Sequence, residues 1–134
     1  MPYFQSHLAL AYALLGQYDE SWHHINQAMA TIEATGERLW TAEVRRLAGE
    51  IALSSPSKDI AKAQNYFESA ISTARQQQAK SWELRASISL TRLWRDEGKR
   101  EKARDVLTPI FRWFTEGFQT HDLKEAKALL QSLS

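Results

Sequence analysis

The polar side chains best suited to chemistry in this sequence are five arginines that lie in two segments. Arg45 and Arg46 are adjacent in the first segment, and the second holds Arg85, Arg92 and Arg95. A guanidinium group forms paired, charge-assisted hydrogen bonds with a carboxylate. These five residues are therefore candidates for binding carboxylates or an acidic peptide.

The competing interpretation is that these arginines lie on ordinary solvated helix faces. Glu50 follows Arg46 by four residues, and Asp96 follows Arg92 by the same step, which is the spacing of an ion pair within one helix. Exposed pairs of this kind contribute only about 0.3–0.5 kcal/mol each, so they would not keep a partner from competing. Both interpretations stay open on the sequence alone.

Other residue patterns that support catalysis or metal binding are weak. The four histidines are His7, His23, His24 and His121, and no two have the i, i+4 spacing that places two ligands on one helix face. The chain has no cysteine, which excludes disulfides, thiolate-bound zinc and a cysteine nucleophile. We therefore expect no catalytic residues, no metal and no cofactor.

Composition limits the class of protein further. The chain has 134 residues, of which 43% are hydrophobic and 25% charged, and its net charge is +1. These values suit one folded domain over residues 1–134 and give little long-range attraction to nucleic acid. The longest apolar run, residues 8–15, is much shorter than the ~20 residues of a membrane-spanning helix, and the first residues do not resemble a signal peptide. We expect a cytoplasmic protein that binds neither nucleic acid nor a membrane.

Helices must position these side chains, because apolar residues recur at helical spacing along almost the whole chain. Glycine and proline are few, and no period-2 run suggests a strand. Breaks at Gly16, Gly36, residues 54–58, Gly98 and residues 115–120 separate the helical patterns. The predicted helices are residues 3–15, 18–34, 37–53, 59–78, 80–97, 100–115 and 121–132.

The predicted helices form pairs that repeat along the chain. In every second helix a small residue is followed by an apolar residue four positions later and by another seven positions later. The sets are Ser21, Ile25 and Ala28; Ala63, Phe67 and Ala70; and Ala103, Leu107 and Ile110. Small residues let two antiparallel helices approach closely, and the large residues fill the space toward the next pair.

This pattern resembles the tetratricopeptide repeat (TPR), in which a helix with a W-x2-L-G-x2-Y signature precedes one with A-x3-F. The resemblance implies an all-α, right-handed superhelix of three antiparallel helix pairs, at about residues 2–36, 37–78 and 80–116, with a capping helix at 121–133. The fit is imperfect, because Gln5, Val44 and Ser87 replace the signature tryptophan and the step is about 40 residues. A generic helical array is the alternative.

Several segments are also similar to a narrower group. Residues 40–50, 74–98 and 113–130 resemble the C-terminal repeat region of bacterial signalling ATPases that carry adenylate or guanylate cyclase domains. The chain contains no G-x-x-x-x-G-K-[ST] phosphate loop and no cyclase metal-binding carboxylates. The resemblance therefore implies a fragment or shortened relative of such proteins, without enzymatic activity.

The TPR resemblance also assigns a binding surface. In a TPR pair the first helix lines a concave groove, and the corresponding positions here are Tyr3, His7, Arg45, Arg46, Gly49, Arg85, Ile88, Ser89, Arg92 and Arg95, with Ser6 and Leu10 beside them. The implied function is a scaffold or interaction module that binds a protein or peptide through this groove. The alternative is a regulatory sensor region of a larger ATPase or cyclase, whose other domains would then be its partners.

Two further expectations concern the ends and the tryptophans. An uncovered apolar face at the N-terminal end would promote self-association. Trp22 is expected to face solvent or a further repeat upstream, whereas Trp94 is expected to be structural because it occupies a core position of the repeat.

Overall fold

The structure, a computed structural model, describes residues 2–35, 41–54, 58–114 and 120–133. Across these ranges the chain forms seven α-helices and no strand, which confirms the predicted all-α fold. Observed helix ends lie within a few residues of the predicted ones. The helices are α1 (Pro2–Leu14), α2 (Tyr18–Thr35), α3 (Thr41–Ser54), α4 (Ile60–Gln76), α5 (Lys80–Asp96), α6 (Arg100–Trp113) and α7 (His121–Leu133).

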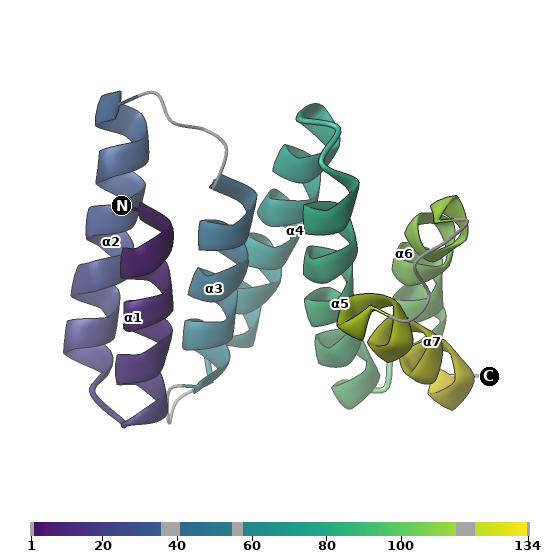
Figure 1. Cartoon of the computed structure of the whole chain (residues 1–134). Helices are drawn as coiled ribbons and strands as arrows, with labels where there is room; N and C mark the ends of the chain where they lie inside the picture. Colours follow the sequence, from purple (N-terminus) through teal and green to yellow (C-terminus); the bar gives the residue numbers. More distant parts are fainter. Residues whose placement is uncertain (1, 36–40, 55–57, 115–119, 134) are drawn as a thin grey trace.

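The first six helices form three antiparallel pairs that stand side by side, α1 with α2, α3 with α4, and α5 with α6 (Figure 1). The seventh helix packs on α5 and α6 and runs across them rather than alongside them (Figure 1). This is the predicted array of three pairs with a capping helix. None of the described helices combines the length and the hydropathy needed to cross a membrane.

Three of the turns between consecutive helices close in the same way. Gly16, Gln78 and Gly98 each have a positive φ, of 80°, 55° and 79°, the left-handed conformation that commonly ends a helix. In each turn the next residue donates its backbone N–H to a carbonyl five residues earlier, from Gln17 to Tyr12, from Ala79 to Ala74 and from Lys99 to Trp94. The sharp reversals follow from this geometry and bring successive helices into antiparallel contact.

The residues of the repeat pattern lie where the helices touch. All nine residues of the three sets in α2, α4 and α6 are buried, with at most 3% of their surface exposed. The one polar member, Ser21, donates its hydroxyl to the backbone carbonyl of Ala9 at 2.7 Å, so its burial leaves no donor unsatisfied. The spacing read from the sequence is therefore the spacing of helix contacts.

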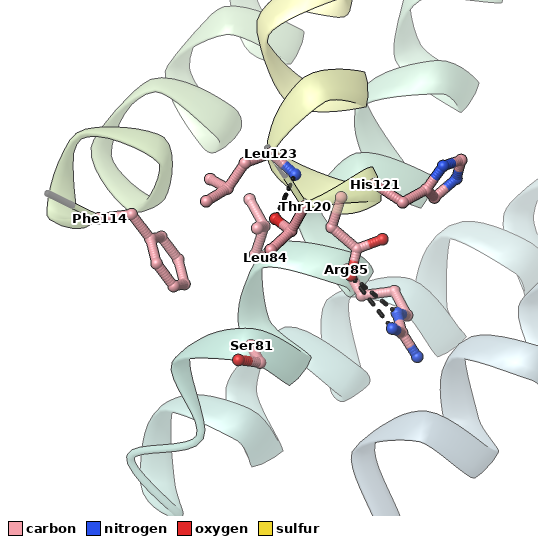
Figure 2. Close-up of a pocket in the computed structure, with 8 residues that line it drawn as sticks. Ser81, Leu84, Arg85, Phe114, Thr120, His121 and Leu123 are labelled. Carbon is pink, nitrogen blue, oxygen red and sulfur yellow. Dashed lines mark hydrogen bonds and ion pairs between the residues drawn. The ribbon is translucent and has the colours of Figure 1, made fainter. Parts of the chain in front are cut away.

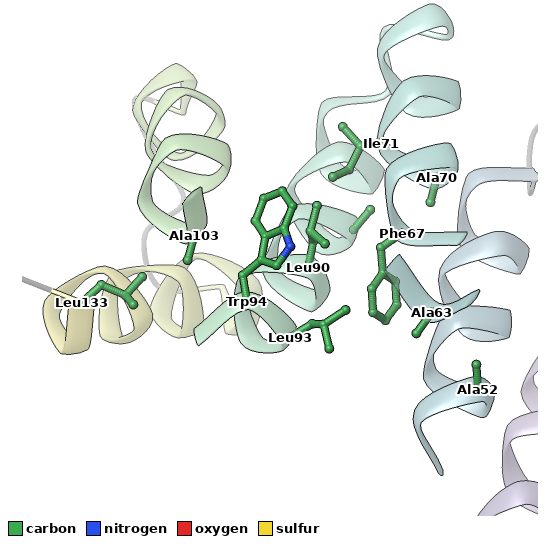
Figure 3. Packing of buried hydrophobic residues seen from close by; sticks show 11 residues of the cluster. Ala52, Ala63, Phe67, Ala70, Ile71, Leu90, Leu93, Trp94, Ala103 and Leu133 are labelled. Carbon is green, nitrogen blue, oxygen red and sulfur yellow. The ribbon is translucent and has the colours of Figure 1, made fainter. Parts of the chain in front are cut away.

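The apolar core consists of three clusters, and the partly buried Trp22 and Val106 each pack against two of them. In its central cluster Phe67 of α4, Leu90 and Trp94 of α5, Ala103 of α6 and Leu133 of α7 lie together (Figure 3). Trp94 is buried, as predicted. Since α7 contributes to this cluster, the capping helix is part of the fold rather than an appendage.

The surroundings of Trp22 differ from the predicted ones. Its ring stacks on Tyr66 with the ring centroids 6.3 Å apart, and the Lys62 ammonium lies 3.9 Å above the ring. Trp22 therefore joins α2 to α4, and the expectation that it faces solvent or an upstream repeat is wrong. A tryptophan in this place ties the first pair to the second.

Candidate functional site

The first helices of the three pairs and α7 surround one hollow of about 260 Å³, which we call the central hollow. Its residues come from α1, α3, α5 and α7, and most of them are charged or polar. They are His7, Glu43, Arg46, Arg85, Ile88, Ser89, Arg92, His121, Asp122 and Glu125.

Two further hollows continue from the central one along α5. The first, of about 440 Å³, lies between the start of α5, the end of α6 and the start of α7 (Figure 2), and it shares Arg85, His121 and Asp122 with the central hollow. The second, of about 400 Å³, lies between the ends of α3 and α5 and shares Ser89 and Arg92. We call these three hollows, which share lining residues, the arginine groove.

The groove contains a buried carboxylate, that of Glu43, which is 1% exposed. Its two oxygens accept hydrogen bonds from Nη2 of Arg46 at 2.6 Å and from Nε of the same residue at 3.0 Å. Nη1 of Arg46 also lies 3.4 Å from the Ser89 hydroxyl and 3.8 Å from Glu50. This guanidinium is thus fixed by acceptors on α3 and α5.

Arg85 lies between carboxylates from two other helices. Its Nε and Nη2 atoms donate to one oxygen of Asp122 on α7 at 3.2 and 3.1 Å (Figure 2), and Nη1 lies 3.6 Å from Glu43. The guanidinium also lies over the Trp82 ring, 5.4 Å from its centroid. Arg85 therefore connects α3, α5 and α7 at the side of the groove.

Arg92 follows Arg85 by seven residues on α5 and lines both the central hollow and the hollow at the ends of α3 and α5. Its Nη2 pairs with a carboxylate oxygen of Glu125 on α7. The guanidinium has five N–H donors, and more than a third of this side chain is exposed. Arg92 therefore presents hydrogen-bonding capacity to the groove.

Six of the residues assigned to a binding surface from the sequence do lie together in the lining of the central hollow: His7, Arg46, Arg85, Ile88, Ser89 and Arg92. Arg95 is exposed beside Asp96, 3.3 Å away, and lines none of the three hollows. Tyr3 belongs to α1, but its side chain lies outside the described part of the chain.

Arg45 and Gly49 point to a different neighbour, the second helix of their own pair. Nη1 of Arg45 donates to Ser69 at 2.9 Å and to Thr73 at 2.7 Å, both on α4. A Cβ atom on Gly49 would lie 2.5 Å from the Phe67 ring, so Gly49 is a close-packing position. Neither residue lines the groove, because both lie on the face of α3 that contacts α4.

The sequence did not single out the acidic partners in the groove. Glu43, Asp122 and Glu125 each pair with a groove arginine, and two of them come from the capping helix. Of the two expected pairs within helices, Arg46–Glu50 is present, whereas Arg92 is paired with α7 instead.

A cation-binding arrangement was also missed. Oxygen or nitrogen atoms of His121, Asp122 and Glu125 lie within 4.8 Å of one another. Both carboxylates, however, already neutralise arginines, Asp122 with Arg85 and Glu125 with Arg92. A metal ion would have to compete with two guanidinium groups, so these residues fit ion pairing better than metal coordination.

Stacked antiparallel helix pairs with a groove along their first helices define the class of α-helical repeat proteins. A family model described as a tetratricopeptide repeat matches residues 3–76, more than half of the chain. The chain belongs to the tetratricopeptide repeat family. Proteins of this family generally bind other proteins or peptides.

Further comparisons add no relative. No curated protein and no solved structure shows significant similarity to the chain. The resemblance to cyclase-linked signalling ATPases therefore finds no support in the comparisons.

Proposed function

We propose that this chain is a non-catalytic interaction module that binds a segment of a protein or peptide in the arginine groove. The observation that carries this proposal is the convergence of side chains from α1, α3, α5 and α7 on the central hollow, which shares lining residues with the two hollows beside it. Solenoid repeats commonly use such a concave surface for recognition. Membership of the tetratricopeptide repeat family supports the same function.

The surface of the groove suits a segment with both apolar and charged side chains. Phe114, Leu53 and Ile60 supply partly exposed apolar walls to the outer hollows. The side chains of Arg85 and Arg92 are 37% and 38% exposed. Partly exposed guanidinium groups orient a bound segment through hydrogen bonds, and the apolar walls beside them add contact area. Binding would proceed by complementary shape and hydrogen bonding, with no covalent step.

Two expectations from the sequence remain predictions. A regulatory role in a larger ATPase or cyclase is favoured by none of the described contacts. Self-association through the N-terminal pair is compatible with Leu14 and Leu15, which are 74% and 72% exposed at the end of α1, but two exposed residues do not define an interface.

A peptide display experiment tests the proposed function. Peptides selected on the chain from a random library are measured for binding by fluorescence anisotropy. The double variant Arg85→Gln/Arg92→Gln should weaken binding at least about tenfold, as expected for two charge-assisted contacts. The matched control is Arg100→Gln/Arg104→Gln, which removes the same charge from exposed positions on α6.

The outcome is decided by comparing the two double variants. Circular dichroism and thermal unfolding confirm that both remain folded. Equal binding by the groove variant and the control would place recognition elsewhere on the molecule, and failure to select any peptide that binds the folded chain would also count against the proposal.

A further inference from the structure

Each arginine that lines the groove already pairs with a carboxylate of the chain itself. The pairs are Arg46 with Glu43, Arg85 with both Glu43 and Asp122, and Arg92 with Glu125. In the central hollow three guanidinium groups thus meet three carboxylates, so its lining carries no net charge when the histidines are neutral. An acidic partner therefore gains no long-range attraction there.

The two neighbouring hollows do not supply an excess of positive charge either. The hollow at the ends of α3 and α5 adds one cation, Lys58, and three carboxylates, Glu50, Asp96 and Glu97. The hollow beside α6 adds no charged residue beyond those of the central hollow. Among the described residues, the arginine groove is thus neutral to slightly negative, and an acidic peptide would meet repulsion as well as attraction along it.

The groove nevertheless keeps N–H donors that a partner can reach. Nη2 of Arg92 pairs with Glu125, and a guanidinium carries five N–H donors on three nitrogen atoms. Nε and Nη1 of Arg92 have no partner among the described residues, and the side chain is 38% exposed. A neutral carbonyl oxygen would gain a charge-assisted hydrogen bond from these atoms, whereas a carboxylate would place a second negative charge beside Glu125.

We infer, on the basis of the proposed function, that the groove recognises uncharged acceptors and that Glu125 makes it discriminate against carboxylates. The acceptors are the carbonyl oxygens of the partner's main chain and of its Asn and Gln side chains. Two carboxylates that share one guanidinium repel each other, so a partner Asp or Glu binds poorly at Arg92. The partner is then a protein segment with apolar side chains and no excess of carboxylates, unlike the acidic peptide that the arginines alone suggest.

In this arrangement α7 stays in place as a wall of the groove. Its buried residues, Leu123, Ala126, Leu129 and Leu133, anchor it in the core. The side chain of Glu125 is 27% exposed, whereas Glu43 is 1% exposed and Asp122 lies in the first turn of α7, where a negative charge stabilises a helix. Glu125→Gln is therefore the substitution that removes a groove carboxylate with the least effect on the fold.

The test uses the full chain and a fluorescently labelled peptide selected on it from a random library. Each position of the peptide is replaced once by Gln and once by Glu, which are nearly equal in size and differ in charge. Fluorescence anisotropy gives the Kd of each form. With the unmodified chain, the Glu form should bind about tenfold more weakly than the Gln form at the positions that approach Arg92.

The variant Glu125→Gln should narrow or reverse this difference, because Arg92 then lacks its own carboxylate. The matched control is Glu101→Gln, which removes the same charge from an exposed position of α6 and should leave the difference unchanged. Circular dichroism establishes that both variants are folded.

The salt dependence of binding to the unmodified chain is a second measurement that needs no variant. Between ~0.1 M and ~1 M NaCl the Debye length falls from ~10 Å to ~3 Å. The Kd of the selected peptide should change less than about threefold across this range, since neither the groove nor the peptide relies on net charge.

Three results would overturn the inference. They are Glu forms that bind as tightly as Gln forms at every position, equal differences in the Glu125 and Glu101 variants, and an affinity that falls about tenfold or more at high salt. Each of them presupposes a peptide that binds in the groove, so the proposed function would survive. Failure to select any peptide would instead count against the proposed function itself.

Discussion

The carboxylate of Glu43 is buried and accepts two hydrogen bonds from the guanidinium of Arg46, one turn further along α3. Arg85 of the next pair approaches the same carboxylate at 3.6 Å. A charge in this position is stabilised only while its partners remain, because water is excluded from it. The wall of the groove is thus built around a buried negative charge that the sequence alone does not distinguish from an exposed glutamate.

Replacing this charge should destabilise the fold. The variant Glu43→Gln keeps the size of the side chain but removes the negative charge that Arg46 and Arg85 face. We expect a loss of about 2–3 kcal/mol in the free energy of unfolding, below the range for complete removal of one partner of a buried pair. Urea denaturation followed by circular dichroism measures it.

The control for this change is Glu68→Gln, on the exposed face of α4, where the carboxylate accepts a hydrogen bond from Gln64. It should cost less than about 0.5 kcal/mol. Similar losses for the two variants would show that the buried ion pair has no special importance for stability.

The close packing of α3 on α4 predicts an unusual result for a glycine in a helix. Gly49→Ala would normally stabilise an exposed helix by about 1 kcal/mol. Here the new methyl group would lie 2.5 Å from the Phe67 ring, so we expect a net destabilisation of about 1–2 kcal/mol from overpacking. Thermal unfolding measures the effect, and Ser72→Ala at an exposed position of α4 is the control.

A double-mutant cycle identifies the cause. If the Phe67 ring is responsible, Gly49→Ala should cost much less in a Phe67→Leu background than in the unmodified chain. An unchanged cost in that background would point to some other consequence of the methyl group.

The contact of Trp22 with Tyr66 predicts how the array unfolds. Trp22→Ala removes the ring that joins the first helix pair to the second, while each pair keeps its internal contacts. We expect faster hydrogen exchange of backbone amides in α1 and α2, with little change in α5 and α6, since neighbouring repeats stabilise one another mainly through their interfaces. Mass spectrometry resolves these segments.

Trp113→Ala serves as the comparison, because that tryptophan is 56% exposed. It should leave exchange in α1 and α2 unchanged. A uniform increase across all helices in the Trp22 variant would instead mean that the array unfolds as one unit.

Arginines that look equivalent in sequence should differ in function. Arg45→Gln removes hydrogen bonds to Ser69 and Thr73 on α4, so it should lower stability by about 1–2 kcal/mol and leave peptide affinity unchanged. Arg92→Gln should do the reverse, weakening peptide binding severalfold with little effect on stability. Fluorescence anisotropy with library-selected peptides measures the affinity, and urea denaturation measures the stability. A loss of affinity in the Arg45 variant would show that this residue contributes to peptide binding.

Much of the fold followed from the sequence because its signals are local. The spacing of Ser21, Ile25 and Ala28 repeats in α4 and α6. Gly16 and Gly98 each follow the end of a helix, in the left-handed conformation that glycine adopts easily. Such patterns depend on one helix and its immediate neighbour. They therefore predicted helices, pairs and buried contacts without knowledge of the remaining structure.

The site was only partly predictable because its contacts are not local. Arg85 and Asp122 are 37 residues apart in sequence, and their contact depends on the direction in which α7 crosses the last pair. Likewise, the assignment of Arg45 to the groove depended on a helix rotation that small differences in packing decide. Helical periodicity places residues on a face, but it does not tell which neighbour that face meets.

The way the core clusters span the helix pairs also has a mechanical consequence. Its central cluster takes residues from α3, α4, α5, α6 and α7, and Trp22 of α2 packs against it. Bending the array between pairs would separate densely packed side chains and forfeit their dispersion contacts, so these contacts oppose such bending. If the groove binds a partner as proposed, a partner that matches its curvature would bind with less entropic cost of ordering the host.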